Sequence, residues 1–94
     1  MKLYLVHCGF YDKDLSDGLY ETHMNFMVAA ASAVDARASV KKKEVFREKR
    51  MHVDGMQVIE AVDGFRVSLS YDESLSDQSL LETIRHRDLA GDGV

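Results

Sequence analysis

This sequence has no proline and no tryptophan, and it contains a single cysteine, Cys8. A lone cysteine excludes an intrachain disulfide framework and suits a reducing compartment. No run of apolar residues approaches the roughly twenty that a membrane-spanning helix needs. The N-terminal apolar stretch is too short for a signal peptide and lacks a small-residue cleavage site. We therefore expect a cytoplasmic protein that makes no contact with a membrane.

Motifs of familiar enzymes are also lacking. The glycines form no G-x-G-x-x-G run, so nucleotide binding has no motif, and there is no G-x-S-x-G motif of a serine hydrolase. Cys8 follows His7, but adjacent residues of a strand point to opposite faces, so His7 cannot activate the thiol. We predict a buried, inert Cys8 and no cofactor. Enzymatic activity stays open, with a non-enzymatic role favoured.

What remains is the composition of an ordinary globular domain. The chain has 94 residues, of which 46% are hydrophobic and 30% charged, and it shows no internal repeat or low-complexity tract. A chain of this size forms one domain with one core. We place a single α+β domain at residues 1–72. Residues 73–94 form a C-terminal extension, with a short helix followed by a frayed tail.

Alternating apolar and polar residues predict the first two strands. Residues 2–10 form one strand, and residues 19–30 form a second that pairs with it across an Asp- and Gly-rich loop. The alternation divides the second strand into two faces. Tyr20, Thr22, Met24, Phe26 and Val28 point one way, and Glu21, His23, Asn25 and Met27 point the other.

A helix follows the second strand. The Ser32 hydroxyl can cap its N-terminus, and the helix is predicted to run to about Lys49. Its thin apolar stripe consists of Val34, Ala38 and Val45. Near the C-terminus, Ser76 can cap a second, short helix. That helix would carry Leu80, Leu81 and Ile84.

Two Asp-Gly pairs, Asp54-Gly55 and Asp63-Gly64, predict tight hairpins between alternating apolar residues. With Asp63-Gly64 as a two-residue turn, four cross-strand pairs form on one face, which we assign to the core. These pairs are Val62 with Phe65, Glu60 with Val67, Val58 with Leu69, and Met56 with Tyr71. Asp54-Gly55 gives a consistent facing pattern as a second hairpin. The alternative is a bulge at Asp54-Gly55 within one long strand.

The predicted order is therefore β-β-α-β-β-β-(α), an α+β fold with a mostly antiparallel sheet and the main helix packed on one face. The other, wetter face carries the candidate site. Glu21 and His23 lie two residues apart on one strand, about 6.6–7 Å from each other. His52 can reach them from another strand. Two histidines and a carboxylate recur in zinc and non-haem iron sites, so Glu21, His23 and His52 are candidate metal ligands.

Asn25 shares the face of Glu21 and His23, and Asp54 lies two residues after His52. Both are therefore candidates for ligand binding, although Gly55 already makes turn chemistry a sufficient reason for Asp54. The competing interpretation is a solvated polar face whose side chains hydrogen-bond between strands. If the strand of His23 does not lie near that of His52, no site exists.

Three short motifs occur in a fixed order: Glu21-x-His23, His52-Val-Asp54 and Val62-Asp-Gly-Phe65. In this respect residues 2–70 resemble a bacterial family of small domains that occur singly or as two tandem copies. The resemblance implies an α+β domain and no established activity. It supports Glu21, His23, His52 and Asp54 as site residues by position. It also implies that a function needing two copies would require self-association.

Residues 37–50 hold seven basic and two acidic side chains, although the whole chain has a formal net charge of −4. The stretch lacks the aromatic residues of single-strand binders, so nucleic-acid binding is the least favoured function. The leading hypothesis is an interaction or small-ligand-binding module that forms a homodimer. The alternative is a metal-dependent or acid–base enzyme that uses the Glu/His cluster.

Overall fold

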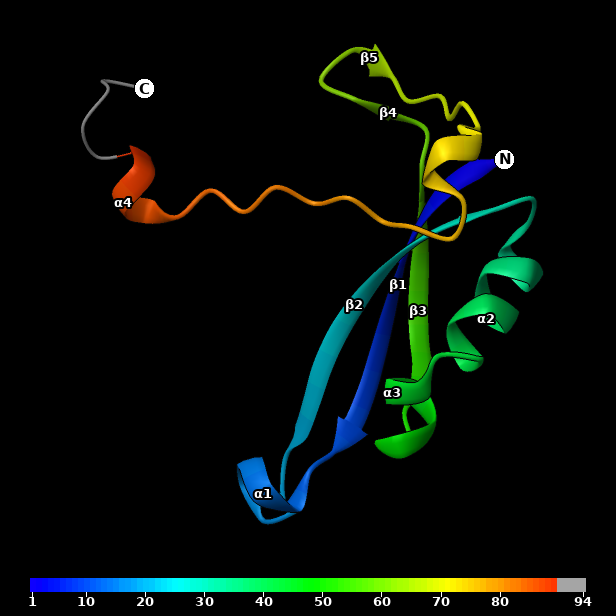
Figure 1. Cartoon of the computed structure of the whole chain (residues 1–94). Helices are drawn as coiled ribbons and strands as arrows, with labels where there is room; N and C mark the ends of the chain where they lie inside the picture. Colours follow the sequence, from blue (N-terminus) through cyan, green and yellow to red (C-terminus); the bar gives the residue numbers. More distant parts are fainter. Residues whose placement is uncertain (90–94) are drawn as a thin grey trace.

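The computed structural model describes residues 1–89 and contains one three-stranded antiparallel sheet (Figure 1). Its strands are β1 (Lys2–Tyr11), β2 (Glu21–Ala30) and β3 (His52–Ile59). Their order across the sheet is β2-β1-β3, and β1 pairs in antiparallel fashion with both neighbours. Together with the helices on one face, this confirms the predicted α+β class.

β1 is the central strand, and its alternating sequence explains its burial. Tyr4, Val6, Cys8 and Phe10 lie on one face and are at most 6% exposed. The residues between them lie on the opposite face, because successive side chains of a strand alternate. One face of β1 therefore belongs to the core, and the other is left for polar residues.

β1 and β2 are paired along their whole length, from Lys2 with Ala30 to Tyr11 with Glu21. The connection contains α1 (Lys13–Ser16), which begins at Asp12, whose carboxylate accepts a hydrogen bond from the Asp14 amide. This register confirms both the predicted pairing of the first two strands and the two predicted faces of β2.

Two helices, α2 (Ala33–Lys41) and α3 (Glu44–Glu48), cover the core face. The Ser32 hydroxyl accepts a hydrogen bond from the Asp35 amide at 3.2 Å, which confirms the predicted N-cap. The predicted single helix to Lys49 is wrong, because Lys43 adopts an extended conformation that separates α2 from α3.

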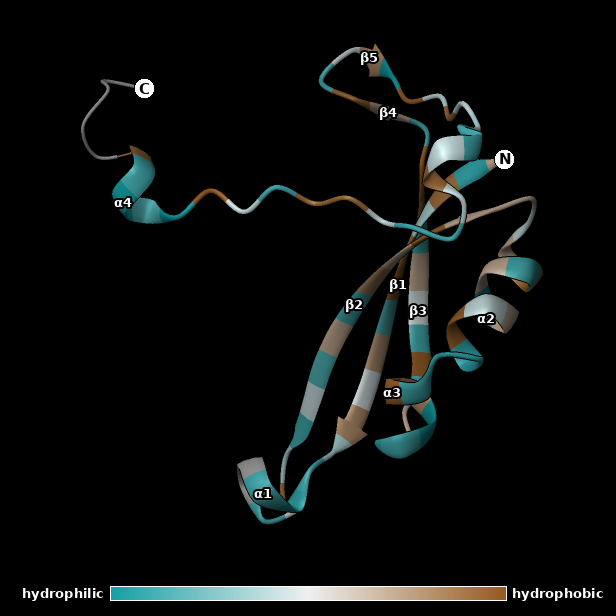
Figure 2. Cartoon of the chain, in the orientation of Figure 1, coloured by the Kyte–Doolittle hydropathy of each residue, from teal (hydrophilic) through white to brown (hydrophobic). Residues whose placement is uncertain are grey.

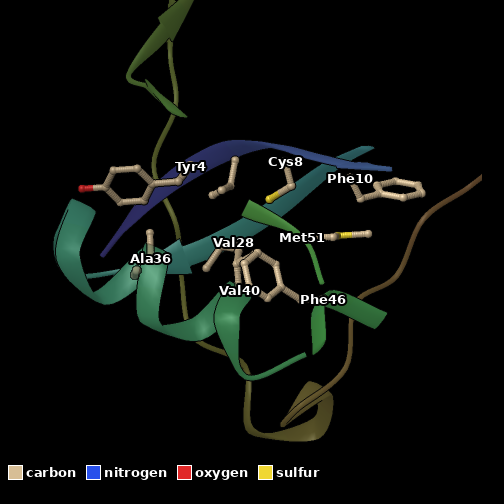
Figure 3. Packing of buried hydrophobic residues seen from close by; sticks show 10 residues of the cluster. Tyr4, Cys8, Phe10, Val28, Ala36, Val40, Phe46 and Met51 are labelled. Atoms are coloured by element: carbon tan, nitrogen blue, oxygen red, sulfur yellow. The ribbon is translucent and has the colours of Figure 1, made fainter. Parts of the chain in front are cut away.

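The predicted apolar stripe is confirmed for Val45, which packs against the core, and is wrong for Val34 and Ala38, which are exposed. Ala36 and Val40 are fully buried and Phe46 is nearly so, whereas Val34 is 77% exposed. In Figure 3 the side chains of Val40 and Phe46 point toward Val28 and the other strand residues of the core. Ala36 with Val40 and Val34 with Ala38 have the same four-residue spacing. The sequence therefore did not distinguish them, and packing on the sheet selects the first pair.

Asp54-Gly55 does not form a hairpin, and this prediction is wrong. A tight two-residue turn needs positive φ at both central residues, and neither Asp54 nor Gly55 is among the residues with positive φ. β3 continues through both residues, with His7 opposite Gly55 and Cys8 opposite Val53. Asp54 is the extra residue of a β-bulge, which was the alternative interpretation. Pairing along β1 satisfies more backbone groups than a three-residue strand would.

The Asp63-Gly64 turn is confirmed, with φ of 51° and 87°. It joins β4 (Ala61–Val62) to β5 (Phe65–Arg66), and Val67 donates a backbone hydrogen bond to Glu60.

The assignment of this hairpin to the core is wrong. Phe65 and Tyr71 are 78% and 80% exposed. Met56, which does pack against the core, pairs with Val6 of β1, and Val58 pairs with Tyr4. Residues 67–71 form no strand beside them, so the predicted pairs with Leu69 and Tyr71 do not form.

The 3₁₀ turn η1 (Glu73–Leu75) lies near the start of β1, and the chain after it runs away from the sheet as an extended segment to the short helix α4 (His86–Leu89) (Figure 1). The predicted helix after Ser76 is wrong, because the leucines and isoleucine assigned to it lie in extended chain, which Figure 2 shows as hydrophobic stretches. The tail predicted to fray, residues 90–94, lies outside the described residues. Among residues 1–89, no helix is long and apolar enough to cross a membrane.

Candidate metal centre

The open face of the sheet, opposite α2 and α3, brings the predicted site residues together. Gly9 of β1 pairs with His23 on β2 and with His52 on β3. One row across the sheet therefore presents two imidazoles on either side of a residue that has no side chain. This confirms that His23 and His52 share one face.

Gly9 is needed here because carboxylates occupy the space above it. A Cβ atom built on Gly9 would overlap Oε1 of Glu21 and lie 2.7 Å from Oδ2 of Asp54. Such distances are too short for carbon and oxygen atoms that are not bonded. The missing side chain of Gly9 therefore lets Glu21 and Asp54 fold over the central strand from both sides.

Each imidazole contacts both carboxylates through its Nε2 atom. For His23, this atom lies 3.0 Å from Oδ2 of Asp54 and 3.1 Å from Oε1 of Glu21. For His52, it lies 2.9 Å from Oε1 of Glu21 and 2.9 Å from Oδ1 of Asp54. The four side chains are between 29% and 48% exposed, so the cluster is open to solvent.

Only two of these four nitrogen–oxygen contacts are hydrogen bonds. One N–H at each Nε2 atom has a single direction, and His23 is hydrogen-bonded to Asp54 while His52 is hydrogen-bonded to Glu21. The second oxygen beside each Nε2 atom lies equally close without a hydrogen bond from it. A cation accepts donor atoms from several directions at once, which a single proton does not.

Strand alternation and a β-bulge together account for the position of Asp54. Asp54 lies two residues after His52, so alternation alone turns its carboxylate to the open face beside His52. The bulge inserts Asp54 between Val53, opposite Cys8, and Gly55, opposite His7. It therefore also returns the following residues, Met56 and Val58, to the side of Val6 and Tyr4.

His7 also belongs to this cluster, and sequence reasoning did not include it. Its ring stacks on that of His23, with centroids 4.6 Å apart and an angle of 8° between the planes. His7 lies two residues before Gly9 on the same strand, so strand alternation places it on the open face. The sequence thus placed His7 on the open face, but its closeness to His23 could be recognised only from the pairing of β1 with β2.

Asn25 lies on the open face as predicted, and its contact is with His7. Nδ1 of His7 donates a hydrogen bond to Oδ1 of Asn25 at 2.6 Å. This bond leaves the lone pair on Nε2 of His7 free to bind a cation. Asn25 therefore orients a candidate ligand.

Among residues 1–89, two groups of three residues have ligand atoms within 4.8 Å of one another. The first consists of His7, His23 and Asp54, and the second of Glu21, His52 and Asp54. Imidazole nitrogen and carboxylate oxygen suit zinc, manganese, iron and nickel, whereas a site selective for copper(I) would contain sulfur.

Cys8 takes no part in the cluster. It lies on the core face and is fully buried, as predicted. Burial raises the pKa of the Cys8 thiol, and the charge of Asp54 raises this pKa further. A thiol that keeps its proton is neither a metal ligand nor a nucleophile.

No protein-family model matches this chain, and no curated protein or solved structure is significantly similar to it. The resemblance to a bacterial domain family therefore stays a prediction.

Proposed function

We propose that this chain is a small-ligand module that binds a divalent transition-metal ion on the open face of its sheet. The observation that carries the proposal is the position of Asp54, whose two oxygens lie within 3.0 Å of Nε2 of His23 and His52. Glu21 contacts the same two nitrogens through Oε1. Two acids and two imidazoles thus converge on one small region.

The exposure of the cluster bears on what a bound ion would do. A structural metal site is closed by four protein ligands, whereas a catalytic site keeps at least one position for water or substrate. A set of three protein ligands leaves such a position open on a four- to six-coordinate ion, and these side chains are accessible to solvent. An ion bound here would therefore polarise water or a small oxygen ligand. A metal-dependent reaction is the enzymatic form of the same proposal.

The first test is metal binding by untagged protein. We expect zinc, manganese or nickel to raise the melting temperature by about 10 °C at one hundred times the dissociation constant, because only the folded chain assembles the cluster. Glu21→Gln and His52→Ala should each reduce this shift.

His86→Ala is the matched control, since His86 is an exposed histidine in α4 outside the cluster. It should leave the shift unchanged. Absence of any metal-induced shift, together with metal-free protein by elemental analysis, would contradict the proposal.

Self-association is a second candidate property, and exposed apolar side chains favour it. Phe65, Tyr71 and Leu81 are between 78% and 83% exposed. They belong to a two-stranded hairpin and to extended chain, which have little stability unless they pack against something else. We propose that a second copy of the chain covers these three side chains, which we call the exposed apolar part. Pairing of like chains is supported by the outer edges of β2 and β3, which no strand of the three-stranded sheet covers.

Light scattering tests this second proposal. A homodimer predicts twice the chain mass at high micromolar concentration, with dissociation on dilution. A monomer throughout this range would contradict it.

Nucleic-acid binding by residues 37–50 stays a prediction that no contact in the described part of the chain favours. Lys43 lies over the Phe26 ring at 5.6 Å, and Lys49 lies over the Phe10 ring at 5.2 Å. Lys49 also pairs with Asp12 at 3.0 Å. These lysines already have intramolecular partners.

A further inference from the structure

Asp54 belongs to both groups of candidate ligands on the open face. One group adds His7 and His23 to it, and the other adds Glu21 and His52. The two oxygens of the carboxylate are divided between them. Oδ2 lies 3.0 Å from Nε2 of His23, whereas Oδ1 lies 2.9 Å from Nε2 of His52.

A carboxylate with each oxygen directed to a different ligand set has the geometry that bridges two metal ions. In two-metal sites the ions lie about 3.5–4 Å apart, which one carboxylate can span. We propose that the open face holds two divalent ions, bridged by Asp54. The first ion is bound by His7 and His23, and the second by Glu21 and His52. This inference rests on the proposed function, because it assumes that the cluster binds metal.

The surroundings of His7 support the first of these two sites. Asn25 accepts the proton on Nδ1 of His7 and so selects the tautomer with a free Nε2 lone pair. The His7 ring stacks face to face on the His23 ring, so the two imidazoles are neighbours on the open face. A single ion bound by Glu21, His52 and Asp54 would leave both of these rings without a role in coordination.

The position of Glu21 supports a shared centre with two adjacent ions. Its Oε1 atom lies 2.9 Å from Nε2 of His52 and 3.1 Å from Nε2 of His23, so this atom faces both sites. Its other oxygen accepts a hydrogen bond from the Tyr11 hydroxyl at 3.5 Å. Glu21 and Asp54 together place negative charge between the two proposed ions, which reduces the repulsion between them.

Metal stoichiometry tests the inference. Protein stripped with a chelator is titrated with Zn²⁺ by calorimetry, and the metal retained after gel filtration is measured. We expect two ions per wild-type chain, one per chain in His7→Ala, and one per chain in His52→Ala. The control variant His86→Ala should keep two. Circular dichroism confirms that each variant is folded.

Mn²⁺ supplies an independent measurement of proximity. Two Mn²⁺ ions bridged by one carboxylate are spin-coupled, so the hyperfine lines of an isolated ion should weaken as the second equivalent binds. In His7→Ala the lines of the isolated ion should persist.

Each outcome separates the inference from the proposal on which it rests. Binding of one ion, with His7→Ala equal to wild type, would overturn the two-ion centre and leave the proposed function intact. Two uncoupled ions, or two ions that persist in both variants, would also overturn it. Absence of bound metal would overturn the proposed function itself.

Discussion

Nε2 of His23 lies 3.0 Å from Oδ2 of Asp54, although the two residues are 31 positions apart and neither belongs to the central strand. They meet because β1 lies between their strands and contributes Gly9 at the level of the contact. Asp54 lies two residues after His52 on β3, so its carboxylate faces the same open side. The candidate site is thus a product of three strands.

Gly9→Ala should weaken metal binding. The new methyl group would occupy the space of the Glu21 and Asp54 carboxylates, which must then move apart. We expect affinity for Zn²⁺ to fall by about 10–100-fold, as for other changes that displace ligands without removing them. Calorimetric titration measures this loss.

Gly55→Ala is the matched control, because a Cβ atom on Gly55 meets nothing within 4 Å and its φ is not positive. Its affinity should equal that of the wild type. Equal affinities for Gly9→Ala and wild type would show that the carboxylates above Gly9 do not bind the ion.

Substitutions on the two faces of α2 should differ in their effect on stability. Val40 is fully buried, so Val40→Ala should lower the free energy of unfolding by about 2 kcal/mol. Val34 is on the same helix and is 77% exposed, so Val34→Ala should change it by less than about 0.5 kcal/mol. Urea denaturation of both variants measures the difference. The reverse order would mean that α2 is rotated from the position described above.

Cys8 should be inert in the folded protein. Burial and the charge of Asp54 raise the pKa of its thiol, and the thiolate is the reactive form. A thiol reagent at mildly alkaline pH should modify Cys8 only after a denaturant is added.

The same shift predicts a pH dependence of stability. Because the thiol binds its proton more tightly in the folded state, its contribution is fully present below the ordinary thiol pKa and is lost as pH rises through the raised pKa. Cys8→Ala should abolish this component of the alkaline loss of stability. Rapid modification of the native protein would contradict the burial of Cys8.

Charged substitutions on the exposed apolar part should shift the oligomeric state. Phe65→Asp and Leu81→Asp should each convert the proposed homodimer to a monomer, because an aspartate buried at an interface loses its hydration. Val34→Asp, on the exposed side of α2, should not. Analytical ultracentrifugation at several concentrations distinguishes these outcomes. A dimer that survives both substitutions would have its interface elsewhere.

Much of the fold could be predicted from local patterns. The alternation of residues 19–30 gave the correct faces of β2, and the Ser32 hydroxyl marked the correct start of α2. These features depend on neighbouring residues alone. The two Asp-Gly pairs show the limit of such reasoning, because the same dipeptide forms a turn at residues 63–64 and part of a bulge at residues 54–55. Pairing with β1 decided the second case.

Only part of the candidate site could be predicted, because local patterns do not show which strands pair. Glu21 and His23 could be placed on one face from their spacing, whereas the contribution of His7 required the register between β1 and β2. The contact of Asp54 with both histidines required the pairing of β3 with β1 as well.

The sequence by itself determined which side chains of a regular strand lie together, because the extended backbone turns each residue to the side opposite its predecessor. Tertiary structure alone decided which strands are neighbours and where their register slips. Backbone hydrogen bonds between strands are nearly independent of side-chain identity, so competing pairings differ only in the burial and contacts that the whole fold provides.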